Sequence, residues 1–150
     1  MTGSATPGDG YGQVCRLTKC FDKIQQTLNL TRTEGTMGYE TTPGAVEPER
    51  GNLYSLELDG QLKHQVDKIG ISNGLAWSSD GSKFFYIDSV AYSVDVFDYD
   101  IEKGTVSNRN VLFDLKKHGI NGLPDGMCTD ANNNLWVAVY TGAKVCRFTI

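Results

Sequence analysis

The sequence lacks the features that several classes of protein require. It has no run of Lys or Arg longer than the pair Lys116 and Lys117, and its net charge is −4, so neither nucleic acid nor an anionic membrane is an expected partner. No apolar run approaches the roughly 20 residues of a membrane-spanning helix. The N-terminus shows no basic region followed by an apolar one, as a secretory signal would. We therefore expect a cytoplasmic protein.

Histidine and clustered cysteine are also scarce, which argues against two kinds of active site. The two histidines, His64 and His118, lie in polar stretches, and no Gly-x-Ser-x-Gly motif is present, so a serine-nucleophile enzyme is not expected. Four cysteines occur, but Cys15 and Cys20 have no partner histidine or second cysteine pair nearby, so a zinc site of the structural kind is not expected either.

What the sequence does contain is β-strand signal from Gly51 onward. Runs rich in β-branched and aromatic residues alternate with short turns such as Asp59-Gly60 and Lys103-Gly104, and connections this short join antiparallel strands. The predicted strands are 52–58, 62–69, 74–78, 83–88, 93–99, 106–115, 127–130, 135–140 and 144–150. Residues 1–34 differ, and we read them as an irregular leader with a short helix over 20–30.

The strands belong to an internal repeat. Asn73-Gly-Leu-Ala-Trp aligns with Asp125-Gly-Met-Cys-Thr, and the apolar run from Phe84 aligns with that from Leu135. A period near 50 residues with about four short strands is typical of β-propeller blades. We predict an all-β fold, two to three blades of a propeller. Because so few blades leave unpaired edges, we expect either a longer protein or an association that covers them. Five aromatic residues, Phe84, Tyr86, Phe97, Tyr99 and Trp136, together with Trp77, are predicted to pack between blades.

Asn73 and Asp125 occupy the same place in the two repeats, each just before a Gly and just before an apolar strand. The innermost strands of neighbouring blades lie around one axis, so these two side chains are expected to face a shared cavity. An amide oxygen and a carboxylate suit a hard cation such as Ca²⁺. The alternative is that Asn-Gly and Asp-Gly are ordinary turn dipeptides, and spacing alone leaves both open.

Longer motifs resemble a known family. They are ISNGLAWS at 71–78, FYIDS at 85–89, VDVFDYD at 94–100, PDGMCTD at 124–130, LWVA at 135–138, GTM at 35–37 and GNLYSL at 51–56. In sequence and order they resemble the regucalcin (senescence marker protein), gluconolactonase and luciferin-regenerating enzyme family. The resemblance covers residues 35–150, which we take as the propeller domain.

This resemblance implies a six-bladed propeller with one divalent metal in its central channel, hydrolysing sugar lactones. It implies that Asn73 and Asp125 are metal ligands, that Asp125 is also the proton donor and acceptor, and that Glu40 binds substrate. The expected metal is Ca²⁺, with Zn²⁺, Mn²⁺ or Mg²⁺ as alternatives. The expected partner is a small-molecule sugar lactone, and the parent protein is expected to be a monomer. A non-catalytic calcium-binding regulatory protein of the regucalcin type is the alternative function.

The sequence departs from the family at two places. The family's third metal ligand is an upstream Glu for which no matching segment exists, and its substrate-gripping Asn-Arg-x-Asn-Asp-Gly motif is replaced by residues 28–34, where Arg32 is not a convincing substitute. The resemblance therefore implies that this chain by itself has reduced activity or none.

Overall fold

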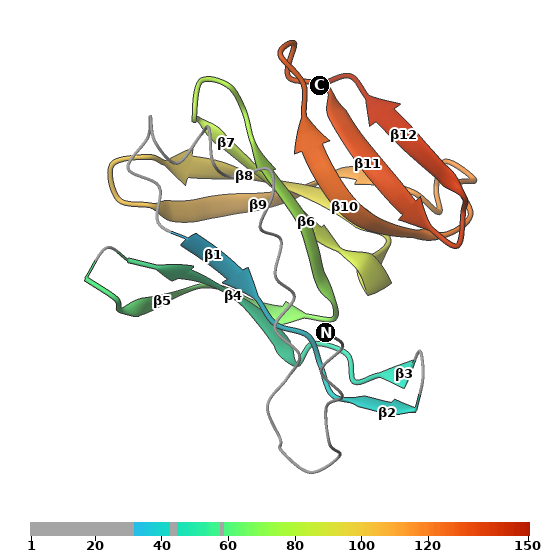
Figure 1. Ribbon diagram of the computed structural model, residues 1–150, viewed down its shortest axis with the longest axis horizontal. Helices are drawn as coiled ribbons and strands as arrows, with labels where there is room; N and C mark the ends of the chain where they lie inside the picture. Colours follow the sequence, from blue (N-terminus) through green and yellow to red (C-terminus); the bar gives the residue numbers. More distant parts are fainter. Residues whose placement is uncertain (1–31, 43–44, 58) are drawn as a thin grey trace, which may run out of the picture.

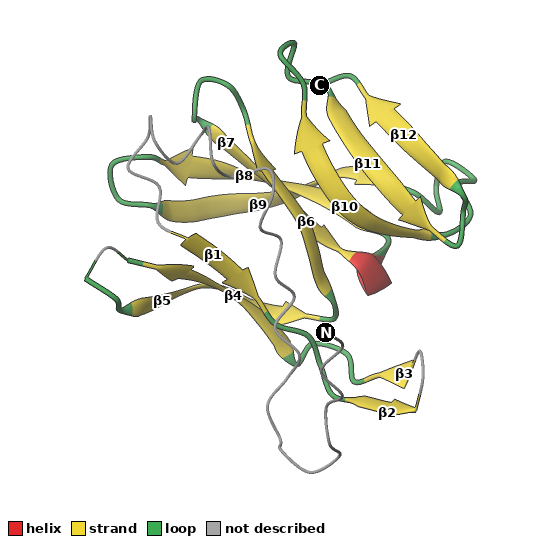
Figure 2. Cartoon of the chain, viewed as in Figure 1, coloured by secondary structure: helices red, strands yellow, loops and turns green. Residues whose placement is uncertain are grey.

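The computed structural model describes residues 32–42, 45–57 and 59–150, and this part of the chain is built almost wholly of strands (Figures 1 and 2). Its one helical segment is a single 3-10 turn, η1 (Ser89–Ala91). No helix in the described residues is long and apolar enough to cross a membrane. The helix predicted over 20–30 lies outside the described residues, as does most of the predicted leader.

Three antiparallel sheets follow one another along the chain, and a small hairpin is inserted in the first. The first sheet has the order β1-β4-β5, the second β6-β7-β8-β9 and the third β10-β11-β12. The first sheet and its hairpin comprise β1 (Arg32–Gly35), β2 (Glu40–Thr42), β3 (Ala45–Val46), β4 (Gly51–Leu56) and β5 (Leu62–Ile69). The second comprises β6 (Ser72–Trp77), β7 (Lys83–Asp88), β8 (Ser93–Asp100) and β9 (Thr105–Asp114). The third comprises β10 (Leu123–Thr129), β11 (Leu135–Tyr140) and β12 (Lys144–Phe148).

The strands β6 and β7 of the second sheet are buried on both faces because they lie between the other two sheets. Along β7, Phe84 and Tyr86 contribute to one hydrophobic cluster, and Phe85 and Ile87 to another. Alternate side chains of a strand point to opposite faces, so the continuous apolar run of β7 serves two cores at once. The first core lies against β4 and β5, where Leu53 is fully buried. The second lies against the third sheet and includes Met127, Leu135 and Val137.

Most of the aromatic residues predicted to pack between blades do so. Phe84, Tyr86, Phe97 and Trp77 are buried, and Tyr99 packs half-buried against the first core. The prediction for Trp136 is wrong, because its side chain is 40 % exposed. Trp136 alternates along β11 with the buried Leu135 and Val137, so it lies on the opposite face of the third sheet, which no described sheet covers.

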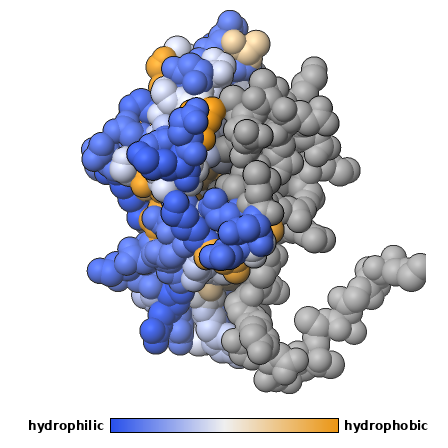
Figure 3. All heavy atoms as spheres, turned by 90° about the vertical axis from the view of Figure 1, so that its left-hand side faces the viewer, coloured by the Kyte–Doolittle hydropathy of each residue, from blue (hydrophilic) through white to orange (hydrophobic). Residues whose placement is uncertain are grey.

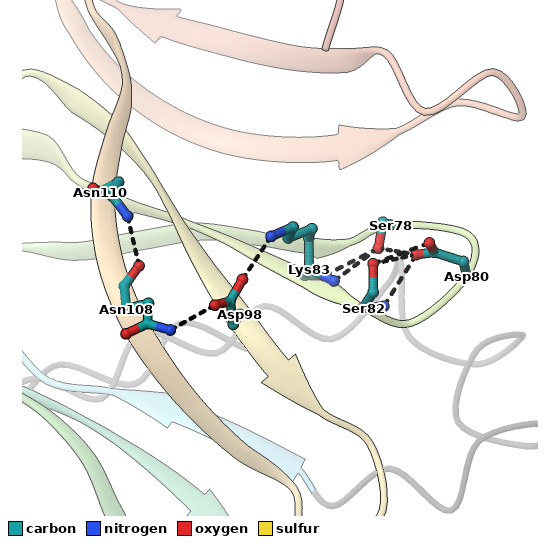
Figure 4. Close-up of polar contacts among 7 residues, drawn as sticks. All are labelled: Ser78, Asp80, Ser82, Lys83, Asp98, Asn108 and Asn110. Atoms are coloured by element: carbon teal, nitrogen blue, oxygen red, sulfur yellow. Dashed lines mark hydrogen bonds and ion pairs between the residues drawn. The ribbon is translucent and has the colours of Figure 1, made fainter.

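The turn between β6 and β7 is held by one carboxylate. Asp80 accepts hydrogen bonds from the Ser78 hydroxyl (2.6 Å) and from the backbone N–H and hydroxyl of Ser82 (3.0 and 2.9 Å; Figure 4). The hydrogen bond from Ser78, followed by those from Ser82, lowers the pKa of Asp80 to about 2. Gly81 follows with φ of +70°, a left-handed conformation that glycine adopts without steric strain.

Polar side chains cover the outer strands of the second sheet. Asp98 on β8 binds the Lys83 ammonium (2.5 Å) and accepts from the Asn108 amide of β9 (2.7 Å), and the Lys83 hydrogen bond is the main cause that lowers the pKa of Asp98. Asn110 donates to the Asn108 carbonyl (Figure 4). The side of the molecule seen in Figure 3 is accordingly mostly hydrophilic over its described surface. Charged outer strands of this kind discourage edge-to-edge pairing between molecules.

Candidate functional site

Two matching β-bulges mark the positions of Asn73 and Asp125. In the β6–β7 pair, Ser72 lies opposite Asp88 and Leu75 opposite Tyr86, so β6 carries one extra residue in between. The β10–β11 pair has the same irregularity between Pro124 and Met127. The extra residues fall at Asn73-Gly74 and at Asp125-Gly126. A bulge of this kind redirects a side chain out of the regular alternation and is common beside functional sites.

The bulges explain why β6 and β10 begin earlier than predicted. The sequence placed the strands at 74–78 and 127–130, with Asn73 and Asp125 before them, whereas the strands begin at Ser72 and Leu123. Asn73 and Asp125 are therefore inside the strands, in irregular steps, and not in free turns that precede them. Both residues are half-buried.

The strands that carry the two residues lie side by side near the middle of the molecule (Figure 1). The Thr129 hydroxyl of β10 donates to the Trp77 carbonyl of β6 at 3.1 Å, across 52 positions of sequence. A Cβ on Gly74 would lie 2.6 Å from the Asp125 carbonyl oxygen and 2.7 Å from the Met127 Cβ. Such close approach is open only to glycine, so Gly74 lets β10 approach next to Asn73.

A buried hydroxyl connects the two strands at the level of the candidate residues. The Asn73 side-chain amide donates to Ser89 Oγ at 3.2 Å, and Ser89 Oγ donates to the Pro124 carbonyl at 2.7 Å. Ser89 is 3 % exposed. Asn73 is thus joined, through one side chain, to the residue directly before Asp125.

The entry into β6 is held by a second buried group, Asp88. Its carboxylate accepts from the backbone N–H groups of Gly70 (2.9 Å), Ile71 (3.0 Å) and Val90 (3.3 Å). Because Gly70 and Ile71 directly precede β6 and Val90 belongs to η1, Asp88 fastens the start of the strand to the turn that carries Ser89. The sequence analysis missed both Asp88 and Ser89.

A polar relay runs from β7 through β6 to the chain after β1. The Tyr86 hydroxyl donates to Ser72 Oγ at 2.5 Å, and Ser72 Oγ donates to the Thr36 carbonyl at 2.6 Å. Burial raises the pKa of Tyr86 far above its ordinary value, so this phenol stays protonated and serves as a donor. The relay secures β6 to the first sheet one residue before Asn73.

Glu40 begins β2 and is exposed. The segment just before it lies against the segment just before β6, since Gly38 N–H donates to the Gly70 carbonyl at 3.0 Å and Met37 bridges Ile71. Figure 1 accordingly shows the β2–β3 hairpin at the end of the molecule where β6 begins. The structure therefore brings the strand of Glu40 to the same end as Asn73.

The two candidate ligands have the oxygen atoms that a hard cation prefers, but two side chains are a small number of ligands. Asn73 and Asp125 offer an amide oxygen and a carboxylate, which are the ligand types that Ca²⁺ prefers. Among the residues that the structure describes, no group of three or more His, Cys, Asp or Glu side chains is placed to hold a metal ion. The two expected ligands would thus supply only part of a full coordination sphere.

Comparisons with known proteins agree with this architecture. A family model described as SMP-30/Gluconolactonase/LRE-like region matches residues 33–150. Proteins named regucalcin from Oryctolagus cuniculus and Homo sapiens are each 50% identical to the chain over 113 residues, which cover 75% of this chain and 37% of theirs. The chain thus spans little more than a third of the length of these relatives.

Solved structures give the same result. A luciferin-regenerating enzyme superposes with a TM-score of 0.72 at 35% identity, covering 83% of this chain and 44% of that one. A calcium-binding protein named regucalcin from Agrobacterium tumefaciens has a TM-score of 0.62 at 23% identity, covering 79% of this chain and 41% of that one, and supports the fold alone. The chain belongs to the SMP-30/gluconolactonase/LRE-like family, and its three sheets are successive blades of a β-propeller.

Proposed function

We propose that the protein is a divalent-metal-dependent hydrolase of sugar lactones, to which this chain contributes Asn73 and Asp125 as metal ligands. The observation that carries the proposal is the pair of matching bulges, which put an amide and a carboxylate at equivalent steps of two adjoining strands. Regular strands would not need these irregularities. Membership of the family supports lactone hydrolysis as the reaction class, and Ca²⁺ is the expected ion, with Zn²⁺, Mn²⁺ or Mg²⁺ as alternatives.

The residues of the chain suggest a division of roles. A bound metal polarises a lactone carbonyl and lowers the pKa of water. Asp125 is the proposed proton acceptor and donor for attack on the ring ester. Asn73 would bind the metal through its amide oxygen, and one N–H of the same amide donates to Ser89. Glu40, at the same end of the molecule, is proposed to bind the hydroxyl groups of the sugar.

A second function is favoured by the small donor set. The described residues contain no group of three or more His, Cys, Asp or Glu side chains that could hold a metal ion beside the two expected ligands. Several relatives carry the name regucalcin, and one solved structure of that name is described as a calcium-binding protein. The protein would then bind Ca²⁺ and regulate a partner without turnover.

The two functions are separated by an assay on two forms. One is the 150-residue chain, and the other is a chimera in which it replaces the matching segment of the rabbit relative. Gluconolactone hydrolysis is measured with Ca²⁺, Zn²⁺ or Mn²⁺ and with chelator. We expect the chimera to hydrolyse the lactone, and Asp125→Ala to lower the rate at least about 100-fold as for loss of a general base. The exposed Asp67→Ala is the matched control.

The results of this assay decide between the hydrolase and the regulatory function. Hydrolysis that persists in chelator and in Asp125→Ala refutes the metal-dependent mechanism. Calcium binding in both forms, without hydrolysis in either, supports the regulatory function instead.

A further inference from the structure

Ser89 occupies a fixed place between two blades. It follows β7 directly and begins η1. Its backbone N–H donates to the Ile71 carbonyl at 3.0 Å, next to the start of β6. Its hydroxyl contacts Asn73 on one side and Pro124 on the other. With 3 % of its surface exposed, the side chain has little freedom to choose other partners.

The directions of these hydrogen bonds follow from counting protons. A serine hydroxyl has one proton to donate and can also accept. The Pro124 carbonyl can only accept, so the hydroxyl proton goes to Pro124 at 2.7 Å. Toward Asn73 the Ser89 oxygen can therefore only accept, and Asn73 must present its N–H group there. The amide oxygen of Asn73 is consequently turned away from Ser89.

This orientation is the one that a metal ligand needs. An amide coordinates a hard cation through its oxygen, never through its N–H group. If the Asn73 amide could rotate freely, one of its two orientations would turn the NH₂ group, and not the oxygen, toward the cation. We propose that Ser89 is a positioning residue, whose hydroxyl holds the Asn73 amide with Oδ1 available to a divalent cation and ties it to the strand of Asp125. This inference rests on the proposed metal site and adds the residue that orients it.

The test measures Ca²⁺ affinity of the 150-residue chain by calorimetry. Ser89→Ala is expected to weaken binding about tenfold, as for other partners that orient metal ligands. Ser78→Ala is the matched control, because Ser78 is also buried and also loses a hydrogen-bonded hydroxyl, but it lies in the β6–β7 turn. It is expected to leave the affinity within about twofold, since distant sites act independently.

A second pair of variants distinguishes the effect of the Ser89 hydroxyl group from the effect of a larger side chain on packing. Ser89→Thr and Ser89→Val have the same shape and would crowd the site equally, but only threonine keeps the hydroxyl. We expect Thr to bind Ca²⁺ more tightly than Val by about tenfold. The side-chain NH₂ signals of Asn73 in a ¹⁵N spectrum, assigned by their loss in Asn73→Ala, are expected to shift in Ala and Val and to be retained in Thr.

The possible negative results distinguish an error in the proposed metal site from an error in the proposed role of Ser89. If Asn73→Ala leaves Ca²⁺ affinity unchanged, the metal site is wrong and the role of Ser89 falls with it. If Asn73→Ala abolishes binding while Ser89→Ala behaves like Ser78→Ala, the metal site stands and the role of Ser89 is overturned. Equal affinities of the Thr and Val variants, or Asn73 signals that do not move, overturn it as well.

Discussion

The close approach of β10 to β6 at Gly74 predicts a large difference between two glycine substitutions. Gly74 and Gly126 hold equivalent places, each directly after a candidate ligand in a bulge. A Cβ on Gly74 would lie 2.6 Å from the Asp125 carbonyl oxygen and 2.7 Å from both the Met127 backbone nitrogen and Cβ. These are backbone atoms or atoms next to the backbone, so β10 itself must move. A Cβ on Gly126 would meet no described atom within 4 Å.

The expected size follows from the distances. Ordinary van der Waals contact begins at 3.4 Å, so β10 would have to move away by about 0.8 Å, and forced overpacking of this kind typically costs about 1–3 kcal/mol. Against this, Gly→Ala lowers the entropy of the unfolded chain, which stabilises by about 0.4–1 kcal/mol at a compatible site. We expect Gly74→Ala to be less stable than Gly126→Ala by about 2 kcal/mol.

Urea unfolding followed by tryptophan fluorescence measures this difference, since Trp77 lies in the first core. The slopes of the two transitions should agree, so that the midpoints report stability alone. Gly74→Ala should also weaken Ca²⁺ binding if the metal site is as proposed, because it separates the strands of Asn73 and Asp125. Equal midpoints for the two variants would show that β6 and β10 do not approach as the structure has them.

Two further predictions concern charged groups. Arg109 binds the buried Asp95 through Nε and Nη2, each at 2.7 Å. Arg109→Met should lower the free energy of unfolding by about 3 kcal/mol, because it leaves the Asp95 carboxylate buried without its partner. Restored stability on adding Asp95→Asn would confirm this cause, and an unchanged denaturation midpoint in the single variant would contradict it. Asp130 accepts from the Trp136 indole N–H and from Asn134, which in that order lower its pKa to about 2. The ionised form is favoured in the folded state, so its contribution to stability is present above about pH 4 and is lost as the pH falls toward 2. In a carboxyl-carbon NMR titration, Trp136→Phe should raise the pKa of Asp130, and an unmoved titration would refute this assignment.

The strands that the sequence predicted best are those with strong alternation or with two buried faces. The predicted range 135–140 is that of β11, along which buried and more exposed side chains alternate, and the range 83–88 is that of β7, which is buried on both faces. β1 and β2 were missed because Arg-Thr-Glu-Gly and Glu-Thr-Thr carry no apolar pattern. Pairing with β4 makes β1 a strand, and that information is not local to its residues.

The candidate residues were found through the repeat, but the structure around them was not. Alignment of the two copies paired Asn73 with Asp125, and the adjoining strands agree with that pairing. The bulges were not predicted, and the sequence left open whether these dipeptides are ordinary turns, since Pro124-Asp-Gly has the composition of a turn. A signal for Ser89 did exist: the second copy has Tyr140 where the first has Ser89. Only the fold, however, shows that the first copy's hydroxyl reaches Pro124 of the second.

The joint between the second and third blades is made at both ends of their inner strands. Ser89 reaches Pro124 at one end, and Thr129 reaches Trp77 at the other. Hydrogen bonds are directional, so two of them spaced along one seam resist pivoting as well as separation. Together with the apolar core between the second and third sheets, these contacts hold the angle between the two sheets. In a closed β-propeller, the number of blades in the ring depends on the angle at each such joint.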